Sequence, residues 1–97
     1  MKPELLDDTA TQQAITTLDG WHIKGHELVK EFQFPEYLAG IAFANQVAHL
    51  ADAMNHHPDI YVGWKKVTLH ISTHSVGGLT DLDFSLARKT DTLKTSM

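Results

Sequence analysis

The residues best suited to chemistry lie in the segment 52–58, DAMNHHP, where a helical pattern stops and a loop begins. Polar side chains at such a junction can meet a ligand, because no regular packing consumes them. Asp52 and His56 are four residues apart, so the carboxylate could orient or charge-stabilise the imidazole if the last helical turn persists. Imidazole has the unperturbed pKa nearest neutrality, so the adjacent His56 and His57 suggest proton transfer. The alternative is that this segment is only a polar helix exit.

Histidine is abundant: the chain has seven in 97 residues, and five of them fall between His49 and His74. His74 ends a predicted strand before the glycine pair 77–78, where it could act on a ligand or simply face solvent. His49, Asp52 and His56 share one helical face, at a spacing that could hold a divalent metal. That spacing is common by chance and no second ligand cluster is evident, so the metal hypothesis is the weaker one. The remaining histidines are predicted to be surface residues without a role: His22, His26 and His70.

Two hairpins are predicted to carry the strands, over residues 21–34 and 60–73. In the first, Gly25 lies in the turn region and side chains alternate after it. In the second, Gly63 lies near the bend, and apolar and polar side chains alternate from 67 to 72.

The longest helix is predicted over 35–54, between the two hairpins. Pro35 suits its first helical position, where the missing N–H would be unpaired anyway. A short helix capped by Asp8 or Thr9 and ending near Leu18 is predicted before the first hairpin.

The last helix is predicted to begin at the capping-box pattern of residues 80–83 and to run to about Leu93, with Asp83 as the N3 carboxylate. Each hairpin is thus followed by a helix. The pattern predicts an α+β fold, in which helices pack on one face of a four-stranded antiparallel sheet. It leaves the strand order open.

Composition narrows the class of protein. A chain of 97 residues suits one domain, and 42% hydrophobic with 21% charged residues is ordinary for a globular protein. The absence of cysteine excludes disulfides and thiolate zinc sites. A net charge of −4 argues against nucleic acid as a partner. The sequence has neither a signal-like apolar N-terminus nor about 18 consecutive apolar residues, so we expect a cytoplasmic protein that does not contact a membrane.

The spacing of residues from 52 to 83 resembles the signature of the pterin-4a-carbinolamine dehydratase family. Asp52 is followed after three residues by His56-His57-Pro58, after five more by Trp64, after nine more by His74 and after eight more by Asp83. The match is specific because five anchor points fall at the right spacings within 32 residues. Segments 20–21, 32–34, 72–74 and 78–83 also resemble the family. The resemblance extends from about Leu18 to Leu86, whereas the first 17 residues and the tail after Arg88 carry little of it.

The resemblance implies a site around a pterin. His56, His57 and His74 would surround the substrate. Further substrate contacts are implied for polar residues at or near these histidines: Asp52, Asn55, Ser72, Thr73, Ser75 and Asp83. Trp21 and Trp64 match aromatic positions of the family, but neither is expected to be catalytic, and Trp21 is more readily a core residue.

The resemblance further implies dehydration of 4a-hydroxytetrahydropterin to quinonoid dihydropterin, which recycles the pterin cofactor of aromatic amino-acid hydroxylases. Elimination needs an acid for the leaving hydroxyl and a base for a ring proton, and histidines can supply both near neutral pH. We expect His56 and His74 to be candidate acids and His57 to position the ring or act as the base. The pterin is the substrate, so neither a cofactor nor a metal is expected.

For the whole chain, 1–97, the resemblance implies a single domain of this family and a homodimer or homotetramer with a functional link to a hydroxylase. Exposed edges of a small sheet also favour self-association, since proteins pair, cover or charge such edges. The alternative function is a non-catalytic module that binds a pterin or serves as a dimerisation cofactor of a homeodomain transcription factor. The presence of all three histidines favours the enzyme.

Overall fold

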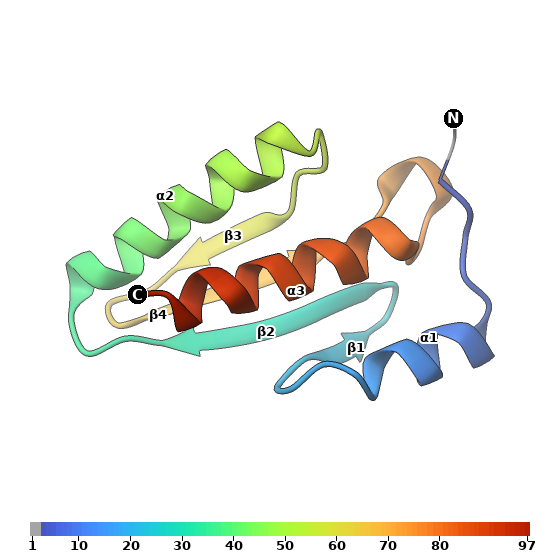
Figure 1. Ribbon diagram of the computed structural model, residues 1–97, viewed down its shortest axis with the longest axis horizontal. Coiled ribbons are helices and arrows are strands. Elements are labelled where there is room, and N and C mark those ends of the chain that lie inside the picture. Colours follow the sequence, from blue (N-terminus) through green and yellow to red (C-terminus); the bar gives the residue numbers. More distant parts are fainter. Residues whose placement is uncertain (1–2) are drawn as a thin grey trace.

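A four-stranded antiparallel sheet forms the framework of the protein, whose computed structural model describes residues 3–97 (Figure 1). Along the chain the elements are α1 (Asp8–Ile15), β1 (His22–Lys24), β2 (Glu27–Gln33), α2 (Tyr37–Ala53), β3 (Asp59–Val62), β4 (Lys66–Ile71), the short 3-10 helix η1 (His74–Val76) and α3 (Asp81–Thr95). The strand order is β1-β2-β4-β3. The two predicted hairpins are therefore β1–β2 and β3–β4, joined through the central pair β2–β4.

Alternation along β4 explains how the sheet separates core from solvent. Val67, Leu69 and Ile71 are fully buried, while the residues between them are only half-buried. The central register places Phe32 opposite Val67 and Leu28 opposite Ile71, so apolar side chains from both strands face the same side. The predicted alternation of this hairpin is confirmed.

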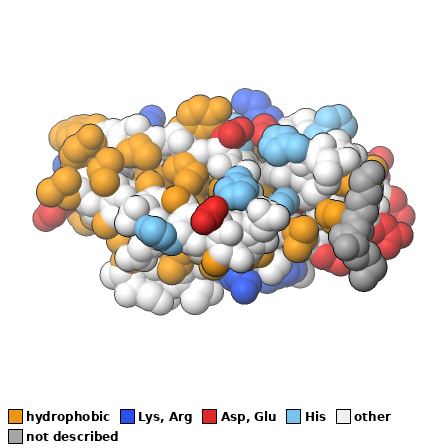
Figure 2. All heavy atoms as spheres, turned by 90° about the horizontal axis from the view of Figure 1, so that it is seen from above, with side chains coloured by type: hydrophobic (Ala, Val, Ile, Leu, Met, Phe, Trp, Pro, Cys, Tyr) orange, Lys and Arg blue, Asp and Glu red, His pale blue; other side chains and the backbone are white. Residues whose placement is uncertain are grey.

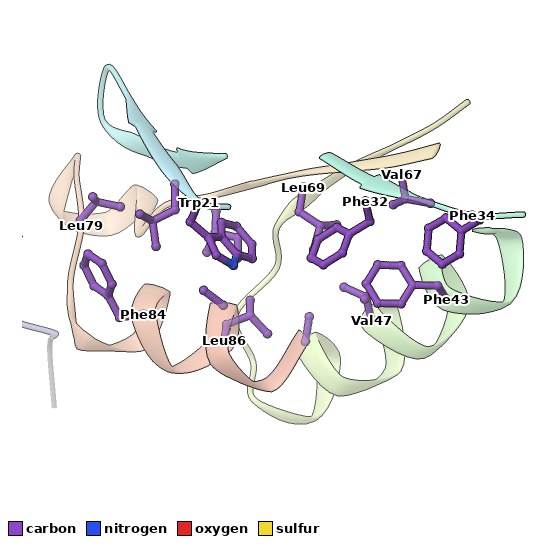
Figure 3. Close-up of a cluster of buried hydrophobic side chains, with 14 residues drawn as sticks. Trp21, Phe32, Phe34, Phe43, Val47, Val67, Leu69, Leu79, Phe84 and Leu86 are labelled. Atoms are coloured by element: carbon purple, nitrogen blue, oxygen red, sulfur yellow. The ribbon is translucent and has the colours of Figure 1, made fainter. Parts of the chain in front are cut away.

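Helices α2 and α3 cover the apolar face of the sheet, and the core lies between these two layers (Figures 1 and 3). Aromatic rings fill its middle: the Phe43 ring of α2 lies 4.8 Å from that of Phe32 and 5.2 Å from that of Phe34, measured between centroids. Buried Phe84 and Leu86 are the contribution of α3 to the same core. The predicted α+β architecture is confirmed, with α2 as the longest helix.

Two helix starts differ from the prediction. Pro35 lies before α2 and is not its first residue, because the Phe34 N–H is still bonded to the Lys65 carbonyl at 2.9 Å and Glu36, the N-cap of α2, has an extended backbone. At α1 the capping residue is Asp7, whose Oδ1 accepts from the Ala10 N–H at 2.8 Å.

Helix ends differ as well. The regular part of α1 stops at Ile15, and three i→i+3 bonds continue the turn to Leu18, whose N–H reaches the Ile15 carbonyl. The predicted start of α3 is confirmed, because Thr80 and Asp83 form a full capping box. This helix runs to Thr95, slightly beyond the predicted end.

Lys30 points from β2 toward the helices and is held by a polar cross-link. Its Nζ donates to Asp91 of α3 and to the Asp19 carbonyl, both at 2.8 Å. The same Asp91 carboxylate accepts from Trp21 Nε1 at 3.0 Å, so Trp21 is buried with its N–H paired. The cross-link ties β2 to α3 and confirms Trp21 as a core residue.

Among residues 3–97, none of the helices combines the length and apolar composition needed to cross a membrane.

Candidate active site

The end of α2 sets the directions of His56 and His57. Asn55 adopts a left-handed backbone with φ of 52°, a conformation that asparagine tolerates better than most residues. The N–H of Asn55 then bonds the Asp52 carbonyl, and that of His56 bonds the Ala51 carbonyl, both at 3.0 Å. This is the Schellman termination of a helix, with asparagine in the position usually taken by glycine. After the turn, His56 is buried and His57 is exposed.

The end of β4 delivers the second half of the site. Thr73 pairs with Gly78 across a tight loop, and Gly77 closes that loop with φ of 70°. The loop contains η1, which begins at His74. The end of β4, the end of α2 and the start of α3 lie on the same side of the molecule (Figure 1), and this loop lines one cavity together with the turn that carries the two histidines.

The two segments enclose a cavity of about 440 Å³. Its lining is mostly polar and consists of Pro3, Met54, Asn55, His56, His57, Ser72, Thr73, His74, Ser75 and Leu82. Cavities of similar size lie elsewhere, for example about 460 Å³ on α1, so volume alone does not single this one out. The convergence of three imidazoles distinguishes this cavity from the others. Seen from above, most of the histidine side chains in view lie over the middle and right of the molecule, whereas apolar side chains are densest on the left (Figure 2).

His56 and Asp83 form the buried pair of the site. The Nε2 atom of His56 lies 2.6 Å from Asp83 Oδ1, and the Asp83 side chain is inaccessible to solvent. The other carboxylate oxygen, Oδ2, accepts from Thr73 Oγ1 and from the Thr80 N–H, both at 2.8 Å. Every oxygen of this carboxylate is therefore engaged within the protein.

His57 and Asp52 form a second pair, at 3.0 Å between Nε2 and Oδ1, but this one is open to solvent. The side chains are 60% and 82% exposed. Exposed ion pairs contribute roughly 0–1 kcal/mol, so this contact constrains His57 far less than burial constrains His56.

The structure thus brings seven of the nine predicted site residues to one cavity: Asn55, His56, His57, Ser72, Thr73, His74 and Ser75. Asp52 and Asp83 lie behind it, each against a histidine. The hydroxyl of Thr73 is already committed to Asp83 and Thr80. The direct substrate contacts expected of Asp83 and of the Thr73 hydroxyl therefore do not fit this geometry.

Sequence reasoning missed three residues of the lining: Pro3, Met54 and Leu82. Met54 and Leu82 could have been predicted as lining residues, since each adjoins a predicted site residue at a helix end. Pro3 could not, because only the tertiary fold brings the N-terminal segment here. This segment is fixed where the Leu6 N–H bonds the Leu79 carbonyl at 2.9 Å.

The metal hypothesis does not fit the described side chains. His56 turns to Asp83, whereas His49 and Asp52 line a different cavity beside α2 and β3. Within residues 3–97, no group of three or more His, Asp or Glu side chains is arranged to hold a metal ion.

His22 and His26 are exposed as predicted, but His70 is half-buried. Its Nδ1 lies 3.2 Å from Glu27 Oε1 across the β2–β4 pair, on the sheet face away from the helices. Trp64 is 71% exposed and lies outside the cavity.

Residues 4–93 match the model of the family described as pterin 4 alpha carbinolamine dehydratase. The chain belongs to this family. The match begins well before the predicted limit at Leu18 and ends beyond Arg88, so the family likeness covers the N-terminal segment and most of α3 as well.

Relatives of this dehydratase family span nearly the whole chain. A protein of Roseiflexus castenholzii, named as a proposed pterin-4-alpha-carbinolamine dehydratase, is 48% identical over 87 residues, which is 90% of this chain and 94% of the relative. One from Metallosphaera sedula with the same name is 45% identical over 82 residues, 84% of this chain and 85% of the relative.

Two solved structures share the fold. A transcriptional coactivator/pterin dehydratase from Brucella melitensis superposes with a TM-score of 0.87 at 30% identity, over 92% of this chain and 97% of the other. A pterin dehydratase-like protein, described as a RuBisCO assembly factor in the alpha-carboxysome, gives a TM-score of 0.62 at 26% identity, over 75% and 84%.

Proposed function

We propose that this protein dehydrates a 4a-hydroxytetrahydropterin to the quinonoid dihydropterin and so recycles the cofactor of an aromatic amino-acid hydroxylase. The observation that carries the proposal is the convergence of His56, His57 and His74, from two distant segments, on one cavity of about 440 Å³. This volume falls within the roughly 300–1,000 Å³ typical of small-molecule sites. Family membership supports the same reaction.

The reaction needs only proton transfers. The C4a hydroxyl takes a proton and leaves as water, while a ring nitrogen loses a proton and its electron pair forms the new double bond. Histidine is suited to both transfers near neutral pH, each worth about 10²–10⁴-fold in rate. We assign His56 and His74 as candidate acids and His57 as the base or a ring-positioning residue.

Three side chains remain free to recognise the polar edge of the pterin. Asn55, Ser72 and Ser75 line the cavity, and no hydrogen bond to another described side chain occupies them. An amide and two hydroxyls can donate and accept hydrogen bonds, as the pyrimidine ring of a pterin requires. In this proposal the ring lies against these groups, with C4a toward the histidines.

The proposal includes neither a metal nor a redox cofactor, because the ring of the substrate supplies the electron pair. It also places the protein in the cytoplasm, with the hydroxylase that produces the carbinolamine.

The experiment generates the carbinolamine in situ with an aromatic amino-acid hydroxylase and follows the loss of its absorbance. The purified protein should accelerate this loss well above the uncatalysed rate. A double variant, His56→Ala with His74→Ala, should be close to the uncatalysed rate. Wild-type protein that is no faster than buffer would refute the proposal.

A second candidate is a protein-binding module, favoured by an exposed apolar surface. This surface, the α2 face, comprises Tyr37, Leu38 and Ile41 at the start of α2, with exposures of 50%, 71% and 37%. Figure 2 shows apolar side chains over this half of the molecule. The Brucella melitensis protein is called a coactivator and the carboxysome protein an assembly factor, so relatives with protein partners have this fold.

We propose that a second copy of the chain covers the α2 face, giving a homodimer or homotetramer. Unpaired edges of β1 and β3 add further surface that favours self-association. An active homo-oligomer that dissociates on Leu38→Glu would assign the α2 face to self-association. A monomer without turnover would instead favour the binding module.

A further inference from the structure

The buried side chain of Asp83 makes two hydrogen-bonded contacts that serve different purposes. As the N3 residue of α3 it completes the capping box by accepting from the Thr80 N–H at 2.8 Å. Its second oxygen holds His56 Nε2 at 2.6 Å, across 27 residues of sequence. A capping box needs only the first of these bonds. The capping box therefore does not explain the contact between Asp83 and His56.

The directions of the hydrogen bonds around Asp83 follow from counting hydrogens. The Thr73 hydroxyl has one hydrogen and donates it to Asp83 Oδ2 at 2.8 Å. The Thr80 hydroxyl must then donate to Thr73 Oγ1, 2.9 Å away, while it accepts from the Leu82 N–H. The Thr73 hydroxyl and the Thr80 N–H thus both donate to Asp83, and the N-terminus of α3 also favours negative charge there. The carboxylate therefore accepts from His56, whose Nε2 carries the hydrogen.

The other ring nitrogen of His56, Nδ1, is reached by solvent. Within residues 3–97, every fully buried side-chain nitrogen or oxygen has a hydrogen-bond partner. Nδ1 of His56 has no partner among the side-chain bonds, so it must be accessible to solvent although the residue is only 8% exposed. The ring lines the cavity. Since Asp83 holds Nε2, Nδ1 is the ring nitrogen left available to a ligand.

We infer that Asp83 is a positioning residue: it fixes His56 as the Nε2–H tautomer, so that Nδ1 is the atom that exchanges a proton with the substrate. Its catalytic part rests on the proposed dehydration. In that reaction protonated His56 gives its Nδ1 proton to the C4a hydroxyl, which leaves as water. The neutral imidazole that remains keeps its Nε2–H on Asp83. Thr73 supports the arrangement by holding the opposite carboxylate oxygen.

The exposed His57–Asp52 pair shows why burial matters to this inference. It joins the same two atom types, Nε2 and a carboxylate oxygen, at 3.0 Å, but both partners are exposed to water. Water can replace either partner there, so that pair does not fix a tautomer. His56 has no such freedom, because Asp83 is sealed from solvent.

Replacing Asp83 by Asn tests the inference with almost no change of shape. The Asn carbonyl would accept from the Thr80 N–H, which leaves the amide NH₂ facing His56. An NH₂ donor favours the tautomer with hydrogen on Nδ1, the wrong one for the proposed geometry. We expect kcat to fall by about 10²–10⁴-fold, the worth of a general acid, with KM changed by less than about threefold.

The spectroscopic measurement is nitrogen-15 NMR of the imidazole rings at a pH where His56 is neutral. Wild-type His56 should show hydrogen on Nε2, and Asp83→Asn should show it on Nδ1. Asp83→Glu, which keeps the charge, should recover the wild-type tautomer and part of the rate. The matched control is Glu27→Gln, beside His70 and outside the site, which should leave the rate and the His56 spectrum unchanged.

The outcomes separate this inference from the proposed function. An Nδ1–H tautomer in active wild-type enzyme would overturn the inference alone, and this measurement needs no folded variant. Asp83→Asn that switches the tautomer yet keeps its kcat within about twofold would overturn the catalytic part. Wild-type protein with the Nε2–H tautomer but without turnover would refute the proposed function while supporting the placement of His56 by Asp83.

Discussion

His56 is expected to contribute to stability as well as to turnover, and replacing it by Ala tests both. A histidine that only serves chemistry can be removed without harming the fold. His56 is instead 8% exposed and, within residues 3–97, supplies the only side-chain partner of Asp83 Oδ1. The His56→Ala variant would leave that oxygen without its donor, next to the cavity vacated by the imidazole.

The magnitude follows from the contacts that are lost. A hydrogen bond to a charged group contributes about 1.5–3 kcal/mol. Removing one partner of a fully buried ion pair costs about 3–5 kcal/mol. The cavity beside His56 admits water to the vacated space, which keeps the cost below the upper figure. We therefore expect His56→Ala to lower the free energy of unfolding by about 2–4 kcal/mol, within the range of these two cases.

The assay is urea unfolding followed by circular dichroism, with His74→Ala as the matched control. His74 lines the same cavity but is exposed and has no side-chain partner among the described residues. Its replacement should change stability by no more than about 0.5 kcal/mol. All variants are compared at one protein concentration, because the proposed self-association would add a concentration-dependent term to the stability. Both variants should lose about 10–10³-fold in dehydration rate, since water can partly replace a general acid.

Equal stability of His56→Ala and His74→Ala would refute this reasoning, because it would mean that the His56–Asp83 contact contributes nothing to the fold. A less stable His56→Ala with an unchanged rate would keep the structural role and remove the catalytic one.

Three further predictions concern other parts of the molecule. His57→Ala should weaken pterin binding in a titration with dihydropterin but shift stability by less than about 0.5 kcal/mol, since the side chain is exposed; unchanged affinity would contradict the positioning role. Chelation by EDTA should leave turnover within about twofold, because histidines suffice for the proton transfers; activity lost with EDTA and restored by zinc would replace this mechanism. Leu38→Glu should dissociate the oligomer in sedimentation by placing a charge on the α2 face; an unchanged oligomer would place the interface elsewhere.

Much of the fold could be predicted from local pattern. Alternation in 67–72 predicted β4 because a strand presents successive side chains to opposite faces. The capping box at 80–83 predicted the start of α3, since its bonds form within one turn of chain. Helix starts that depend on neighbouring contacts were predicted less well. Pro35 precedes α2 because Phe34 is still paired with Lys65, a contact across the sheet.

The site divides in the same way. The spacing of His56, His57 and His74 is a property of the sequence, and it resembles the family without reference to any tertiary contact. The hydrogen-bond partner of each imidazole, in contrast, could not be predicted from neighbouring residues in the sequence. Asp52, four residues before His56, was the carboxylate predicted to orient its imidazole. In the structure His56 instead bonds Asp83, 27 residues away.

The physical reason is that local pattern records short-range geometry, whereas partners across the fold depend on how helices and strands pack. The Schellman turn at Asn55 rotates His56 into the protein and leaves His57 outside, and only the packing of α3 beside that turn brings Asp83 within hydrogen-bond distance. The sequence by itself determined the elements, the histidines and the family. The tertiary structure decided the strand order, the burial of one histidine, and the carboxylate that holds it.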